Sequence, residues 1–180
     1  MKRNILIFIG IIVGIYLVVS VLNYRSEYNA EVYLFKANKI LSQILQSPQS
    51  TPPHIFKRRI DSYKKVIEKF PGSESAKRAI LFLGQVCIIN NQPEQARLEL
   101  NKAISQYTDD KDFLAEIKFL IGNSYEKQDQ WDKARQIYNN ILTDYPDSPR
   151  AMHVPIYIAR YYQSKSDTKE AELAYQQAVI

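Results

Sequence analysis

The sequence has little of what catalytic sites and disulfide-stabilised folds are built from. It contains a single cysteine, Cys87, so no disulfide can form within the chain. Its two histidines, His54 and His153, lie far apart, and the motifs of phosphate-binding loops, zinc proteases, serine hydrolases and dithiol redox sites do not occur. We therefore expect no enzymatic activity, no metal and no cofactor. Cys87 is interpreted as a buried packing residue.

Glycine and proline are also scarce, with 5 and 8 in 180 residues, which favours helix over strand. A hydrophobic content of 46% excludes a disordered tail. The net charge is +5, and Lys2 and Arg3 supply two of these charges ahead of an apolar segment, so the rest of the chain carries +3. A charge this small is not the signature of a nucleic-acid-binding domain, and we expect no nucleic-acid partner.

Charge is absent altogether from residues 5–22. A helix of about 20 apolar residues spans a hydrocarbon core of ~30 Å. A cleaved signal peptide is the alternative, but its apolar core is shorter, about 7–15 residues, and a cleavage site should follow it. Here the best small-residue site lies inside the apolar run, and no lipid-attachment cysteine follows the run. We predict that residues 1–23 form an uncleaved, single transmembrane helix.

The charges around this segment predict its orientation. Lys2 and Arg3 precede it, whereas basic and acidic residues balance each other after it. Positive residues remain in the cytoplasm, so we expect a single-pass protein of the inner (plasma) membrane with its domain on the extracytoplasmic, in bacteria periplasmic, side. Gly10 and Gly14 form a GxxxG pattern that would let two anchors pack into a homo-oligomer; glycine is also common in membrane helices that do not dimerise.

Apolar residues at helical spacing follow the apolar segment. They predict helices over residues 30–46, 54–69, 75–90, 92–107, 113–127, 130–144, 152–164 and 168–180. Three prolines interrupt the pattern within residues 47–53. Pro155 is expected in the first turn of its helix, or at a kink if that helix begins sooner. We divide the chain into the anchor, a stalk with the first helix and a proline-rich loop over residues 24–53, and a helical-repeat domain over residues 54–180.

The helix pairs repeat one arrangement of small and large residues. Small residues stand on the first helices at Gly84, Gly122 and Ala159, and on the second helices at Ala96, Ala134 and Ala171. Large residues follow the second set by four positions, at Leu100, Tyr138 and Tyr175. A small residue lets two helices approach where they cross, and the large residue fills the space beside the crossing. Three copies in phase predict a solenoid, an architecture that binds partners.

This pattern resembles the tetratricopeptide repeat family, whose 34-residue unit places Leu-Gly, Tyr, Ala, an aromatic residue and Pro at set intervals. Residues 115–148 match it best, through Ile121-Gly122, Tyr125, Ala134, Tyr138 and Pro146. The endings at residues 70–73 and 145–148 are similar to those of membrane-anchored bacterial envelope members. The resemblance implies an all-α fold, in which the N-terminal transmembrane helix precedes a short solenoid of helix pairs.

In this family the first helices of the pairs line a concave groove that binds peptides. Carried over by register, the candidate groove residues are Arg78, Leu81, Gln85, Glu116, Phe119, Asn123, His153, Ile156 and Arg160. Apolar members among polar ones would suit a peptide with an apolar side chain at its centre. The alternative is that Leu81, Phe119 and Ile156 only pack against neighbouring helices.

A basic stretch lies beside the proline-rich loop, at Lys57, Arg58, Arg59, Lys64 and Lys65. It could meet an acidic partner or anionic lipid headgroups, or it could be a solvated helix face. The acidic turn at residues 109–112 is interpreted as a linker because it lacks the spaced oxygen ligands of a calcium loop.

Together these features predict a non-enzymatic, membrane-anchored scaffold or adaptor that binds proteins or client peptides in a bacterial cell-envelope complex. Two alternatives stay open, which are a chaperone-like accessory factor of protein secretion or outer-membrane assembly, and a self-assembling structural subunit.

Overall fold

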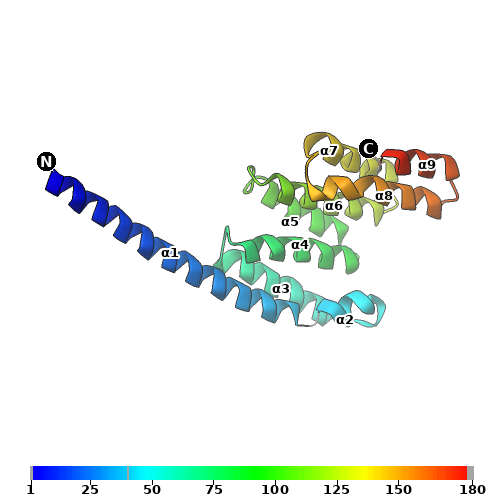
Figure 1. Ribbon diagram of the computed structural model, residues 1–180. Helices are drawn as coiled ribbons and strands as arrows, with labels where there is room; N and C mark the ends of the chain where they lie inside the picture. The colour runs from blue at the N-terminus through cyan, green and yellow to red at the C-terminus, as the bar shows by residue number, and fades with distance from the viewer. Residues whose placement is uncertain (1, 40, 178–180) are drawn as a thin grey trace.

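The computed structural model describes residues 2–39 and 41–177, and all regular structure in these residues is helical (Figure 1). The elements are α1 (Lys2–Asn38), α2 (Leu41–Gln46), the short 3₁₀ helix η1 (Pro48–Ser50), α3 (Pro53–Lys69), α4 (Glu74–Ile89), α5 (Pro93–Ile104), α6 (Lys111–Glu126), α7 (Trp131–Asp144), α8 (Pro149–Ser164) and α9 (Thr168–Gln177). The predicted all-α fold, with a long apolar N-terminal helix followed by helix pairs, is confirmed.

The helices after the projecting part of α1 form a two-layered solenoid. Neighbouring helices pack in pairs, α4 with α5, α6 with α7 and α8 with α9, and the C-terminal part of α1 packs on α3 and α4. Contacts also connect α1 to α4, α4 to α6, and α6 to α8. The helices α1, α4, α6 and α8 therefore make one continuous layer, called here the first-helix layer, and α3, α5, α7 and α9 make the second-helix layer (Figure 1).

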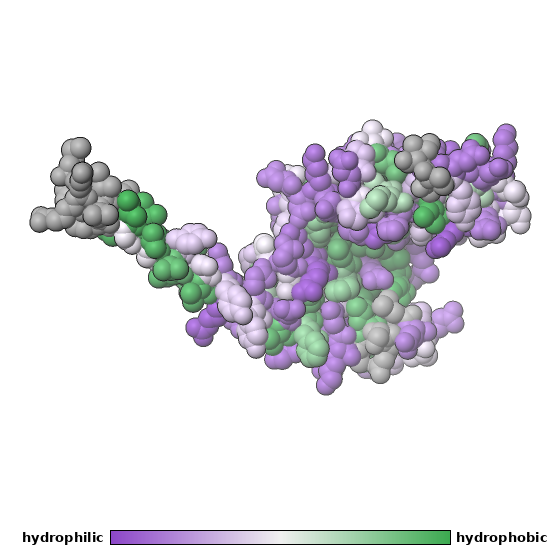
Figure 2. All heavy atoms as spheres, viewed as in Figure 1, coloured by the Kyte–Doolittle hydropathy of each residue, from purple (hydrophilic) through white to green (hydrophobic). Residues whose placement is uncertain are grey.

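Helix α1 belongs both to the apolar segment and to the solenoid, because it continues without a break through both. The side chains of residues 9–22 are exposed, and this stretch projects from the domain as an apolar rod (Figure 2). Further along, Ala30, Leu34 and Ala37 recur every three or four residues, and each is at most 3% exposed. By length and composition α1 could cross a membrane. Its buried half joins the apolar rod to the solenoid without a linker.

The end of α1 differs from the prediction of one helix over residues 30–46. Helix α1 ends at Asn38 and α2 begins at Leu41. The cause is a contact distant in sequence, because Arg59 donates hydrogen bonds to the carbonyls of Lys36, at 3.2 Å, and of Ala37. Carbonyls at a helix end lack partners within the helix, and a guanidinium satisfies them here.

Three first helices begin earlier than predicted, because a side-chain oxygen accepts a hydrogen bond from a free amide in each first turn. The capping residues are Ser73 for α4, Asp110 for α6 and Ser148 for α8, at donor–acceptor distances of 3.0–3.1 Å. The early start of α8 corrects the place of Pro155, which lies inside the helix rather than in its first turn. Its ring leaves the Ala151 carbonyl without the usual helical donor.

Helix α9 begins as predicted, with the Asp167 carboxylate 3.2 Å from the amide of Glu170. It ends at Gln177, and the last part of the predicted helix, residues 178–180, lies outside the described residues.

Close approach at the helix crossings is confirmed by the space around two glycines. A Cβ atom added to Gly84 would lie 2.9 Å from Leu100 Cδ2, and one added to Gly122 would overlap the ring of Tyr138, with Cδ1 at 2.8 Å. Leu100 and Tyr138 are both fully buried. The small residue of the first helix and the large residue of the second therefore occupy one shared volume in each of these two repeats.

Gly122→Ala should destabilise the protein, because the Tyr138 ring cannot move aside without displacing the aromatic residues packed on it. We expect a loss of about 1–3 kcal/mol from overpacking, partly offset by the better helix propensity of alanine. The measurement is urea unfolding of the full chain in detergent, followed by fluorescence of the single tryptophan, Trp131, which lies near Tyr138. Gly84→Ala is the matched control and should cost less, since the flexible end of Leu100 can rotate away. Equal losses would contradict this interpretation.

Arg59→Leu should also destabilise the protein, by about 1.5–3 kcal/mol, because it removes charge-assisted hydrogen bonds to the end of α1. The neighbouring variant Arg58→Leu alters an exposed side chain and should stay within about 0.5 kcal/mol of the parent. Unfolding midpoints of the two variants decide the matter. Unfolding midpoints equal to that of the parent in both variants would show that the Arg59 contact does not stabilise the fold.

Candidate functional site

Ion pairs connect neighbouring helices along the first-helix layer. Arg78 of α4 lies 3.6 Å from Glu31 of α1, and both side chains are more than half exposed. Arg150 of α8 makes a two-pronged contact with Glu116 of α6, at 3.0 and 2.7 Å, and this pair is largely shielded from water. Two-pronged contacts between guanidinium and carboxylate fix orientation as well as distance. These ion pairs fix neighbouring helices of the layer relative to one another. Two of the predicted groove residues, Arg78 and Glu116, therefore already pair with charged side chains of the chain itself.

Three of the predicted groove residues come together at one pocket. Arg78, Leu81 and Glu116 line a hollow of about 260 Å³ between α4 and α6. The other residues that line it are Phe113, Pro149, Glu74, Lys77, Asp110 and Asp112. Apolar side chains therefore meet charged groups in one place. This combination can hold an apolar side chain of a peptide while its polar groups find charged partners.

Phe119 does not belong to the open surface. It is 8% exposed and its ring packs against Tyr138 at 5.4 Å and Tyr157 at 5.0 Å between ring centres. The Arg150 guanidinium lies 4.2 Å over the Phe119 ring. Phe119 therefore packs against neighbouring helices, as the alternative to a groove residue predicted, and Arg150 covers its ring. Sequence reasoning missed Arg150 because the helix that contains it was predicted to begin at residue 152.

The other predicted residues differ in what they contact. Asn123 accepts a hydrogen bond from the Tyr138 hydroxyl at 2.7 Å, which ties it to the core. Gln85 and Ile156 are half-buried, and His153 and Arg160 are exposed on α8. Among the predicted set, Arg78, His153 and Arg160 are thus exposed, and Arg78 is paired with Glu31.

A carboxylate that the sequence did not single out organises the aromatic core at the end of α6. Glu126 accepts hydrogen bonds from the hydroxyls of Tyr157, at 2.8 Å, and Tyr138, at 3.2 Å. Burial raises the pKa of both tyrosines well above the usual range, so both hydroxyls remain donors. Because the two tyrosines come from different repeats, only their contact in space could have shown this role.

The basic stretch is divided by the fold. Arg59 is buried against the end of α1, and Lys64 lies 2.8 Å from Glu99 of α5. Lys57, Arg58 and Lys65 remain exposed.

The distance of the basic stretch from the apolar run limits its contact with lipid headgroups. Arg59 contacts the carbonyl of Lys36, fourteen residues beyond Leu22 at the end of the apolar run. Fourteen residues correspond to ~21 Å of helix, and charges in salt are screened beyond about 10 Å. This separation disfavours a contact of Lys57 and Arg58 with headgroups beside the apolar run. Lys65 lies six residues beyond Arg59 along α3, whose end contacts Tyr33 and is therefore nearer that run.

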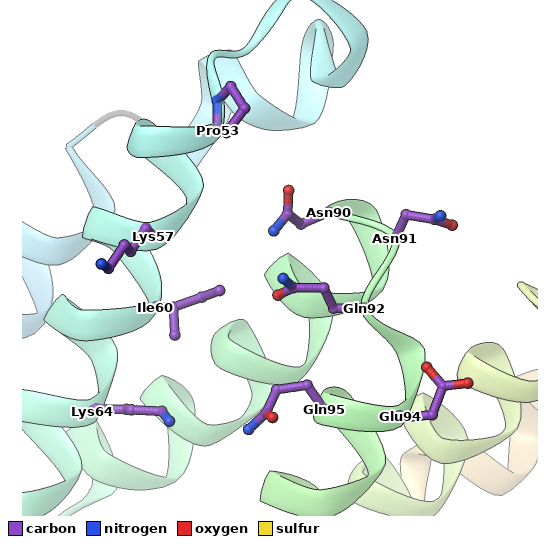
Figure 3. A pocket seen from close by; sticks show the side chains of 9 residues that line it. All are labelled: Pro53, Lys57, Ile60, Lys64, Asn90, Asn91, Gln92, Glu94 and Gln95. Carbon is purple, nitrogen blue, oxygen red and sulfur yellow. The ribbon is translucent and has the colours of Figure 1, made fainter.

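A polar cleft of about 720 Å³ lies beside the exposed cations, between α3 and the turn from α4 to α5 (Figure 3). The side chains of Asn90, Gln92 and Gln95 point toward α3 across it, and Lys57 and Lys64 line the opposite wall. Its wall of amides can donate and accept hydrogen bonds.

Cys87 is fully buried, and burial raises its thiol pKa to about 11. A thiol in this state is a poor nucleophile at neutral pH, in accordance with a packing role. In the projecting part of α1, a Cβ added to Gly10 or Gly14 would meet no atom within 4 Å, so both glycines leave their side of the helix open.

Residues 117–148 match a tetratricopeptide repeat family model. The match begins within α6 and includes all of α7, the pair in which Gly122 and Tyr138 share one volume. It supports the tetratricopeptide repeat family, whose members are typically non-enzymatic modules for protein–protein interaction. No curated protein matches the chain.

The ion pair between the tetratricopeptide-like pairs α4–α5 and α6–α7 should weaken at acid pH. Lys77 lies 2.6 Å from Asp110, and together with the Phe113 amide it holds the pKa of this carboxyl below its usual range. A lowered pKa stabilises the fold above the ordinary aspartate value of about 3.9, and this stabilisation is lost as pH falls through the folded-state pKa.

Thermal midpoints recorded from pH 7 to pH 3 should therefore fall less steeply in Asp110→Asn than in the parent. At neutral pH the variant should lose on the order of 1 kcal/mol or less, because the pair is partly exposed. Asp109→Asn, at the exposed neighbouring position, is the control and should follow the parent curve. Parallel curves for all three proteins would exclude this role of Asp110.

Proposed function

We propose that the protein is a non-enzymatic, membrane-anchored scaffold that binds a protein partner or client peptide on its first-helix layer, within a bacterial cell-envelope complex. The observation that carries this proposal is the pocket where Arg78, Leu81 and Glu116 meet. It joins apolar and charged groups on the layer that binds peptides in tetratricopeptide repeat proteins.

The exposed side chains of α8 extend this surface. His153 and Arg160 lie on the same layer as the pocket and remain open to solvent, with the half-buried Ile156 between them in the sequence. A partner that lies along the layer would thus meet apolar and polar groups on more than one helix, as expected of an extended or helical peptide.

Helix α1 supports placement at a membrane. Its exposed apolar residues would be costly in water and are matched to a hydrocarbon core. In a single-pass protein of the inner membrane, with the solenoid on the extracytoplasmic side, confinement beside the membrane raises the effective concentration of the binding surface near membrane partners.

The proposal is tested by placing a photo-crosslinking amino acid at His153 in the full-length chain, within living cells that express it. We expect one discrete crosslinked product with a second protein, because this exposed side chain lies on the proposed binding layer. Gln136, exposed on α7 in the second-helix layer, is the matched control position and should give no such product.

Ile156→Ala in the His153 crosslinker background should lower the yield, whereas Asn139→Ala on α7 should not. Equal products from the His153 and Gln136 positions would contradict a binding surface confined to the first-helix layer. A crosslinked product of twice the chain mass would indicate self-association and favour the alternative of a self-assembling structural subunit. Protease added to intact spheroplasts should digest the solenoid, and full protection would place it in the cytoplasm.

A further inference from the structure

We propose that one edge of the solenoid lies against the zwitterionic headgroups of the membrane in which α1 is anchored. This edge, called here the proximal rim, consists of the turns at residues 70–73 and 105–110, which connect a second helix to the next first helix. The inference rests on the proposed membrane anchoring and adds to it the surface that faces the lipid.

The first turn of the rim is placed at headgroup depth by a contact with α1. The amide of Glu74, directly after residues 70–73, donates a hydrogen bond to the Glu27 carboxylate at 3.0 Å. Glu27 follows Leu22, the end of the uncharged run, by five residues, or ~7.5 Å along a helix. Headgroup layers extend about 5–8 Å beyond the hydrocarbon core on each side.

The second turn is held to the first by two contacts. The amide of Gly72 lies 3.3 Å from the hydroxyl of Tyr107, and Lys77 bridges Glu74, at 2.5 Å, and Asp110, at 2.6 Å. In Figure 1 both turns lie on the side of the solenoid from which the N-terminal half of α1 projects.

The direction of the helices explains why this edge faces the membrane. Because α1 is itself a first helix and runs away from the apolar rod, the first helices packed beside it in the same direction also begin near the membrane (Figure 1). Every second helix then returns toward it. The turns within pairs, at residues 90–92, 127–130 and 165–167, lie at the opposite edge.

The side chains of the rim indicate which headgroups it fits. Glu74, Asp109 and Asp112 are exposed there together with two exposed lysines, Lys69 and Lys111. A net acidic edge is repelled by anionic lipid and attracted to the ammonium group that forms the outer charge of phosphatidylethanolamine or phosphatidylcholine. On α1, Tyr24 and Tyr28 are exposed next to the apolar run, as aromatic residues at a membrane interface are.

The test uses the full chain in phosphatidylcholine nanodiscs, with the buried thiol removed by Cys87→Ala. A fluorophore is attached in turn to Thr108→Cys on the proximal rim, to Thr168→Cys at the opposite edge, and to Tyr24→Cys beside the apolar run. All three positions are exposed. Nitroxide groups carried by the lipid headgroups then quench the fluorophore over short distances.

We expect several-fold stronger quenching at position 108 than at position 168, approaching the value at position 24. Equal, weak quenching at positions 108 and 168 with strong quenching at 24 would overturn the rim and leave the anchor intact. Weak quenching at all three positions would overturn the membrane anchoring itself, and the rim with it.

Lipid charge tests the headgroup assignment. Replacing phosphatidylcholine by phosphatidylglycerol should reduce quenching at position 108 and leave position 24 unchanged. Asp109→Asn should restore part of the lost quenching, whereas Asp132→Asn, an exposed carboxylate at the start of α7 on the far edge, should not. Quenching at position 108 that is the same in both lipids would overturn the preference for zwitterionic headgroups.

Discussion

The rest of the structure depends on the packing of one half of α1 against α3 and α4. Burial of Ala30, Leu34 and Ala37 makes this half the first helix of the solenoid, while the other half remains an exposed apolar rod. A helix is stiff over this length, so no flexible linker separates the two halves. The direction of α1 therefore sets the direction of every first helix, and with it which edge of the solenoid lies nearer the apolar rod.

Two kinds of contact build the repeats on this helix. Within a pair, a glycine and a large buried residue share one volume, as Gly122 and Tyr138 do. Between pairs, apolar packing such as that of Phe119 on Tyr157 is joined by polar contacts, which include the pair of Glu116 with Arg150 and the hydrogen bonds of two tyrosines to Glu126. Steric fit thus sets the distance inside a pair, and charge-assisted hydrogen bonds add a fixed orientation to the packing between pairs.

In the basic stretch, burial and pairing reduce the number of cations that remain available on the surface. Five cations close together in sequence suggest one electrostatic surface, but Arg59 satisfies the end of α1 and Lys64 pairs with Glu99. Of the remaining cations, Lys57 and Arg58 lie at the end of α3 that is farther from the apolar rod. The edge nearer the apolar rod is acidic instead.

The amino-acid sequence by itself determined the features that depend on neighbours along the chain. Helical periodicity predicted α3 to α7 within a few residues, and the spacing of Gly84 and Leu100 predicted a close crossing. Only the tertiary structure decided the roles of Arg59, Arg150 and Glu126, whose partners lie more than ten residues away. Periodicity reports which face of a helix is apolar, but a polar side chain at the edge of that face has several partners within reach. Which one it meets depends on how the helix pairs stack, and that is a property of the assembled layers.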